Sequence, residues 1–267
     1  MKVLKVILII GGVIVLLAVI AMGYLGYIPA VSKVLGTNTP RDLGVTYTEA
    51  DLASAKNKFG VELAETGTKD PTGSISYEGS HLVNTSFTDE ELTAMVASKR
   101  YIYNPVKNVQ IKIGGDGKLE SSGLLVVSNL DNYFAAVAPG TVSSAEVAKY
   151  TKLLPGEVPY YITGTASVSG GNVSVKLDTV EIARSPKLGN LVARAYANNA
   201  SANVSEFSVG PFNIPSSTLS SYQARINTFL TTRLNRITGL QAKSVTFSGG
   251  KMNFDGSMPN KKTRAVK

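Results

Sequence analysis

The chain has 267 residues, with 27 lysines and arginines against 19 aspartates and glutamates, and a formal net charge of +8. It contains no cysteine, which excludes a disulfide-stapled secreted fold, so a folded domain must rely on an apolar core. The modest positive charge suits an anionic lipid or wall polymer nearby. The basic residues form no stripe with stacking aromatic residues, which argues against nucleic acid as a partner.

The first segment is typical of a membrane anchor. After Lys2 and Lys5, residues 6–28 carry no charge, and about 20 apolar residues suffice to cross a bilayer core. We therefore expect a signal-anchor transmembrane helix over residues 1–28. A cleaved signal peptide is the alternative, although its apolar core is usually shorter. The two lysines indicate a cytoplasmic N-terminus, which predicts a single-pass protein of the cell membrane with its C-terminal domain outside.

A repeated pattern predicts short helices in the next part of the chain. A Ser or Thr is followed three residues later by an acid, with apolar residues on either side, which is a capping box with a hydrophobic staple. Thr48, Thr88 and Ser143 begin these patterns. Residues 29–72 are expected to form a juxtamembrane linker and a helical preamble. The expected helices cover residues 48–59, 88–99, 143–153 and, with less regular spacing, 185–198.

Short alternating runs bounded by Gly, Asn or Asp predict antiparallel hairpins between the helices. These runs cover residues 74–84, 106–113, 119–127, 160–168, 173–182, 207–212, 242–247 and 252–255. Two of the hairpins are similar, because residues 109–123 match 244–256 at a constant offset, with Gly117 opposite Gly250. Each follows an amphipathic helix, so we predict a helix-then-hairpin unit used twice, with both glycines at positive φ in tight turns.

The longest amphipathic helix is expected over residues 214–239. Pro215 suits its start, and Gly239 fits the left-handed residue that often ends a helix. Its polar face carries Arg225, Arg233 and Arg236. Its apolar positions recur every three or four residues and form one stripe: Leu219, Tyr222, Ile226, Phe229, Leu230, Leu234 and Ile237.

These segments resemble a known group of proteins. The sequence GPFNIPSSTLSSYQARINTFLTTRLNRITGLQAKSVTFSGGKMNFDGSMP, together with SFTDEELTAMVA and VQIKIGGDGKLESSG, is similar to small bacterial membrane-anchored extracytoplasmic proteins, YpmS-like, related to the tubular lipid-binding (TULIP) superfamily. The resemblance covers about residues 74–258. It implies an α+β fold in which a curved antiparallel sheet wraps a long amphipathic helix beside an apolar tunnel. It also implies the binding of lipids or other amphiphiles.

The sequence gives little support for an enzyme. His81 is the only histidine, whereas a metal site needs three or four converging ligands. Residues 114–118 lack the spacing of a phosphate-binding loop, and no Gly-x-Ser-x-Gly elbow occurs. We therefore expect no catalytic residue, no metal and no cofactor.

The leading hypothesis is a membrane-tethered extracytoplasmic domain over residues 73–258 that binds a lipid or lipid-linked amphiphile in an apolar groove between helix and sheet. Ile226, Phe229 and Leu230, near the middle of the long helix, are the expected ligand-binding residues. The alternative is a non-catalytic structural or partner-binding module of a cell-envelope complex. The basic residues of 259–267 are expected to form a disordered tail.

Overall fold

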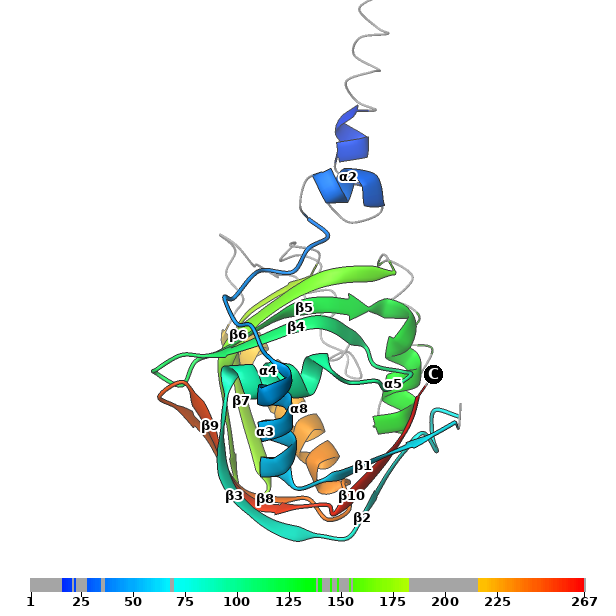
Figure 1. Cartoon of the computed structure of the whole chain (residues 1–267). Helices are drawn as coiled ribbons and strands as arrows, with labels where there is room; N and C mark the ends of the chain where they lie inside the picture. The colour runs from blue at the N-terminus through cyan, green and yellow to red at the C-terminus, as the bar shows by residue number, and fades with distance from the viewer. Residues whose placement is uncertain are drawn as a thin grey trace, which may run out of the picture.

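Antiparallel sheet dominates the fold (Figure 1). The computed structural model describes residues 16–20, 22, 28–34, 37–67, 70–137, 139–140, 145, 148, 154, 156–182 and 216–266. The helices are α2 (Pro29–Val34), α3 (Glu49–Phe59), α4 (Asp89–Ala97), the 3-10 turn η1 (Val127–Asn129), α5 (Leu130–Val137) and α8 (Ser216–Asn235). The strands are β1 (Glu62–Thr66), β2 (Ile75–Glu78), β3 (His81–Thr88), β4 (Val106–Ile113), β5 (Leu119–Val126), β6 (Glu157–Ser169), β7 (Asn172–Ile182), β8 (Gln241–Ser248), β9 (Lys251–Met258) and β10 (Lys261–Ala265).

The capping boxes form as predicted. The Thr48 hydroxyl accepts the backbone N–H of Asp51, whose carboxylate accepts the N–H of Thr48, and α3 begins there. Thr88 and Glu91 make the same reciprocal pair at the start of α4. Because these bonds satisfy N–H groups that have no partner within a helix, they fix both starts locally. The expected strand at 207–212 and the helix at 185–198 lie outside the described residues, as does nearly all of the helix at 143–153.

Seven strands form the larger sheet, in the order β3-β9-β8-β6-β5-β4, with β7 paired to β6. The smaller sheet has the order β1-β10-β2, in which β10 runs parallel to β1 and antiparallel to β2. The prediction of a disordered tail at 259–267 was wrong. Residues Lys261–Ala265 are the central strand of the smaller sheet, because both of their edges find backbone partners.

Three glycines lie opposite β-bulges and let the larger sheet curve. Gly123 faces the register shift in β4, Gly164 the shift in β7, and Gly256 the shift in β8. A Cβ at Gly164 or Gly256 would collide with the backbone of the partner strand. Bulges increase local twist, so the sheet bends at these points (Figure 1). Gly123 and Gly256 are matched positions of the two similar hairpins, and each lies opposite a bulge in the first strand, which supports the repeated unit.

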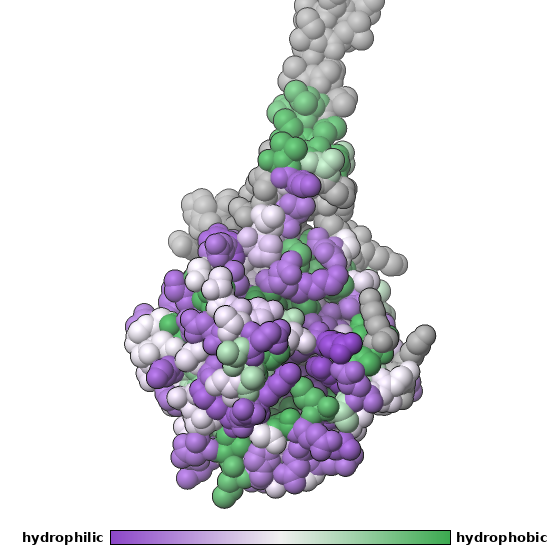
Figure 2. Space-filling view, in the orientation of Figure 1, coloured by the Kyte–Doolittle hydropathy of each residue, from purple (hydrophilic) through white to green (hydrophobic). Residues whose placement is uncertain are grey.

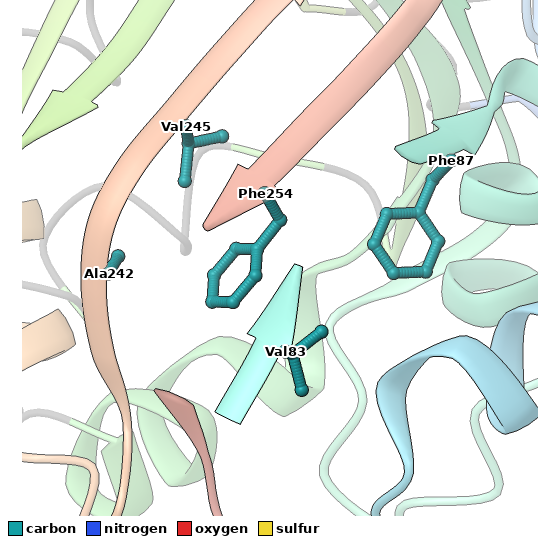
Figure 3. Close-up of a cluster of buried hydrophobic side chains, with 5 residues drawn as sticks. All are labelled: Val83, Phe87, Ala242, Val245 and Phe254. Atoms are coloured by element: carbon teal, nitrogen blue, oxygen red, sulfur yellow. The ribbon is translucent and has the colours of Figure 1, made fainter. Parts of the chain in front are cut away.

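The core lies on the concave side of the sheet. Five side chains from β3, β8 and β9 form its centre (Figure 3): Val83, Phe87, Ala242, Val245 and Phe254. Each of three helices adds one apolar side chain against them: Phe59 from α3, Leu92 from α4 and Leu234 from α8. Phe59 stacks on Phe87 with ring centroids 4.2 Å apart. The three helices are therefore held against the same inner face.

The predicted fold class needs correction. We expected an α+β fold with an N-terminal transmembrane helix before a TULIP-like sheet and helix. The described helices, however, are too short or too polar to span a bilayer, and the fold is mostly antiparallel sheet, with α8 as the one described helix of 20 residues. Most of residues 1–28 lies outside the described part. Leu16 and Leu17 are described residues of this segment, and both are exposed. Figure 2 shows a group of hydrophobic residues in this part of the chain, above a largely hydrophilic body.

Candidate ligand-binding site

The three residues expected to bind a ligand lie on α8. Ile226, Phe229 and Leu230 are half-buried. The rotation of the helix is fixed by Asn227 and Thr231, whose side-chain oxygens accept the backbone N–H groups of Val175 and Val173 on β7 at 2.7 and 2.9 Å. One turn beyond the three residues, Leu234 reaches the core. These three residues line neither of the two hollows that are defined below, so their part in ligand binding stays a prediction.

Arg233 continues this stripe, although the sequence pattern placed it on the polar face. It follows Ile226, Phe229 and Leu230 by seven, four and three residues, so it lies on the same side of the helix. Its guanidinium carbon lies 5.5 Å from the centre of the Tyr133 ring, on α5. Its Nη1 atom is buried and has no hydrogen-bond partner within the described chain. A cation thus interrupts the apolar stripe near the C-terminal end of α8.

Strand β10 brings two further cations. Lys262 and Arg264 are two residues apart in a strand and so point to the same face. The Lys262 ammonium lies 5.7 Å from the centre of the Tyr77 ring, on the neighbouring β2. Arg264 is only 9% exposed, and its Nε has no hydrogen-bond partner among the described residues. Its guanidinium reaches Glu65, on β1, at 3.6 Å.

Lys99, just after α4, completes the group. It has a large accessible surface, yet burial lowers the pKa of its ammonium, and Arg233 and Arg264 lower it further. Both observations hold because surrounding protein atoms remove water from the ammonium while part of the side chain stays in contact with solvent. We call Lys99, Arg233, Lys262 and Arg264 the cationic cluster.

The cluster is short of negative charge. Burial, followed by repulsion from Lys99, Arg264 and Arg233, lowers the pKa of Lys262 to about 8. Glu65 is the one acid that pairs with a cluster residue in the described chain, and its side chain is 39% exposed and also within 3.8 Å of Arg100. Burial also raises the pKa of the Tyr77 phenol, which therefore stays neutral. Four cations facing one carboxylate form a site that can bind an anion.

The sequence reading missed this cluster because its residues come from three distant segments. One signal was available: Lys262 and Arg264 alternate in KKTRA, as they would on one face of a strand. Because residues 259–267 were interpreted as a disordered basic tail, this alternation was not taken as a sign of a strand.

Two hollows are defined by described residues. The larger, about 650 Å³, is an open groove on the larger sheet, where Leu82 is 87% exposed and Lys243 lies 3.4 Å from Asp255. Its lining is Leu82, Gly170, Gly171, Asn235, Gln241, Ala242, Lys243, Asp255, Gly256 and Ser257. The smaller, about 10 Å³, lies where Arg41 pairs with Glu181 at 2.6 Å and covers the Tyr161 ring. It is too small for more than a water molecule, and it lies where the linker is held to the sheet.

His81 has a structural position. Its two ring nitrogens lie 3.0 Å from the Asn260 side-chain oxygen and 3.0 Å from the Phe59 carbonyl, so the imidazole joins β3 to α3 and to the turn before β10. No group of three or more metal-ligating side chains occurs in the part of the chain that the structure describes.

Comparison with known proteins gives no relative: no family model, no curated protein and no solved structure matches the chain. The predicted resemblance to TULIP-related proteins therefore stays a prediction. The function must be argued from the residues of this chain.

Proposed function

We propose that this protein is a non-catalytic binding protein for an amphiphile with an anionic head. The head would lie at the cationic cluster, and the apolar part along Ile226, Phe229 and Leu230 on α8. The observation that carries the proposal is that the apolar stripe of α8 leads to Arg233, within a group of four cations that pairs with one partly exposed acid among the described residues.

The cost of the cluster supports a binding role. Bringing like charges together away from water is unfavourable unless anions pair with them. Arg264 is nearly buried, and two arginine nitrogens of the cluster lack hydrogen-bond partners in the described chain. A bound anion would satisfy these donors, because a guanidinium suits the planar, two-point recognition of carboxylate or phosphate oxygens.

The neighbouring stripe supports an apolar tail. Ile226, Phe229 and Leu230 are only half-buried, and they lead along one side of α8 to Arg233. Each buried methylene of a ligand contributes about 0.8 kcal/mol. A tail of ten methylenes would therefore offset much of the cost of immobilising the ligand.

The test uses the full-length chain. Lipids that copurify with it are identified by mass spectrometry, and binding is measured for a fluorescent acyl chain ending in a carboxylate and for its neutral methyl ester. We expect the carboxylate form to bind more tightly, and Arg233→Gln to remove that preference. Arg236→Gln is the matched control, since Arg236 is exposed and follows the last residue of the same helix. A folded chain that binds neither probe and copurifies with no lipid would refute the proposal.

The open groove favours a second candidate, the partner-binding module of a cell-envelope complex. Leu82 is 87% exposed there, and an open groove with an apolar side chain and a charged pair at its rim has the make-up of a polar-rimmed contact surface. Crosslinking in intact cells, compared between the natural chain and Leu82→Asp, tests this candidate. A partner lost only in Leu82→Asp would support it, and identical crosslinks would count against it.

The location of the protein stays a prediction. The expected site at the cell membrane, with the C-terminal domain outside the cytoplasm, would bring the cationic cluster near anionic lipid. Protease added to intact cells or protoplasts should then digest residues 28–267, and protection of that region would overturn the predicted location.

A further inference from the structure

We infer that the head of the ligand carries at least two negative charges, as a phosphate monoester or diphosphate does, rather than the single charge of a carboxylate or sulfate ester. This inference rests on the proposed function and specifies the head group at the same site. It comes from the number and placement of the charges in the cationic cluster.

The charges in the cluster exceed what one anionic charge can neutralise. Lys99, Arg233, Lys262 and Arg264 come from three separate segments of the chain, and Glu65 is the one acid paired with any of them in the described residues. Glu65 is also shared with Arg100. A single negative charge would leave the cluster with an excess of positive charge, which costs more as the site loses water.

The arrangement of donors also fits a tetrahedral head with several oxygens. Lys262 and Arg264 point from one face of β10, and repulsion from Arg233 and Lys99 acts on the Lys262 ammonium, so all four lie around one region. The Nε of Arg264 and the Nη1 of Arg233 lack partners in the described chain and come from different elements. Phosphate presents three oxygens to such donors, whereas a carboxylate presents two.

Protonation should be coupled to binding. The groups that act on Lys262 are Lys99, Arg233 and Arg264, with the neutral phenol of Tyr77 beside it. Glu65, on β1, and Tyr133, on α5, face its neighbours Arg264 and Arg233. Since the pKa of Lys262 is about 8, this lysine is about half-protonated at pH 8 without ligand. A bound dianion raises that pKa, so binding at pH 8 takes up protons at Lys262.

The experiment compares three short ligands that stay outside detergent micelles: hexyl phosphate, hexyl sulfate and hexanol. Hexyl phosphate is a dianion at pH 8 and hexyl sulfate a monoanion of similar size. Titration calorimetry on the full-length chain, in two buffers with different ionisation enthalpies, gives the affinity and the proton uptake. We expect hexyl phosphate to bind at least about tenfold more tightly than hexyl sulfate, with proton uptake.

Lys262→Met is the informative variant, because methionine keeps an unbranched apolar side chain beside Tyr77. It should lose most of the preference for phosphate and the proton uptake at Lys262. Lys261→Met is its control, since Lys261 lies next to Lys262 on the other face of β10 and should leave both unchanged.

The outcomes separate the two proposals. Equal binding of phosphate and sulfate, both tighter than hexanol, would refute the dianion inference and leave the anionic amphiphile standing. Loss of the phosphate preference in Lys261→Met but not in Lys262→Met would also refute it, because the head would then lie away from Lys262. Equal binding of all three would refute an anionic head altogether. Binding of none of them, together with no binding of the longer acyl probes and no copurified lipid, would refute the proposed function itself.

Discussion

The β4–β5 turn has no room for a side chain at position 117, so only glycine fits there. Gly117 has φ of 82°, and a Cβ there would collide with the carbonyl oxygen of Phe247, before the β8–β9 turn. The two turns touch, since the N–H of Gly249 donates to the carbonyl of Gly115 at 3.3 Å. Gly250 also has positive φ, 73°, but its nearest neighbour would be 3.8 Å from a Cβ. The predicted positive φ is confirmed at both positions. The two positions differ in the room that each leaves for a Cβ atom.

This difference predicts unequal costs for the same substitution. Gly250→Ala should lower the free energy of unfolding by about 1 kcal/mol, because alanine disfavours positive φ. Gly117→Ala should cost about 2 kcal/mol or more, because the contact between the turns must also open. Urea unfolding followed by circular dichroism measures both values. Equal losses would contradict the contact between the two turns.

Glu91 connects two helices through a buried carboxylate. Its side chain is 6% exposed and pairs with the Lys58 ammonium at 2.6 Å, and it accepts hydrogen bonds from the Ser54 hydroxyl at 2.5 Å and the Thr88 N–H at 3.0 Å. Burial opposes ionisation, but the hydrogen bonds from Lys58, Ser54 and Thr88 outweigh it and hold the pKa of Glu91 below its ordinary value. The carboxylate therefore stabilises the packing of α3 on α4.

This lowered pKa predicts a dependence of stability on pH. The contribution of Glu91 is fully present above its unfolded pKa, and it is lost as the pH falls through the lower folded pKa. Glu91→Gln should cost about 2 kcal/mol at pH 7 and should remove that part of the acid destabilisation. Thermal unfolding of both proteins between pH 3 and pH 7 is the measurement. Parallel stability curves for the natural chain and Glu91→Gln would contradict a lowered pKa of Glu91 in the folded protein.

At the scale of elements, two helices cover open strand edges in the same manner. On α4, Asp89 and Thr93 accept the N–H groups of Ile113 and Ile111 on β4. On α8, Asn227 and Thr231 accept the N–H groups of Val175 and Val173 on β7. In each case an oxygen-bearing pair one helical turn apart reaches alternate residues of a strand. Such capping protects edges that could otherwise pair with another chain.

Removal of one capping oxygen should expose the edge of β7. Thr231→Val keeps the shape of the side chain but leaves the N–H of Val173 without its partner, which should cost about 1–2 kcal/mol. Hydrogen exchange should become faster at Val173, with a smaller change at Val175. Thr228→Val is the control, because the Thr228 hydroxyl is exposed and bonds only within α8. Unchanged exchange at Val173 would show that α8 does not cap β7.

At the scale of the whole molecule, the C-terminal strand connects distant parts of the chain. β10 lies between β1 and β2, and it also supplies Lys262 and Arg264 to the cationic cluster. The Ala265 N–H donates to Ser74, and the Val266 N–H to Thr66, so pairing continues to the last described residue. Folding of the smaller sheet and assembly of the candidate site thus depend on the same five residues.

Deletion of residues 261–267 should therefore remove both properties. Without β10, the β1 and β2 strands lose their partner, so the midpoint of thermal unfolding should fall by about 10 °C or more. Binding of hexyl phosphate should be lost as well. Removal of Lys267 alone, beyond the end of β10, is the control and should change neither property. A shortened chain with the melting temperature of the intact one would contradict the central position of β10.

Local chemistry determined much of this protein from the sequence alone. The starts of α3 and α4 and the positive φ of Gly117 and Gly250 each depend on residues within a few positions of one another. Short-range hydrogen bonds and steric limits act there whatever the rest of the chain does. The local sequence pattern was therefore sufficient to predict these helix starts and turns.

Only the tertiary structure decided the smaller sheet and the cationic cluster. KKTRA becomes a strand because β1 and β2, nearly 200 residues earlier in the chain, offer backbone partners on both sides. Helical spacing places Arg233 beside the apolar residues of α8, but only the fold brings Lys99 and β10 to it. Pairing and charge proximity between distant segments depend on where the chain returns in space, and neither spacing nor composition encodes that return.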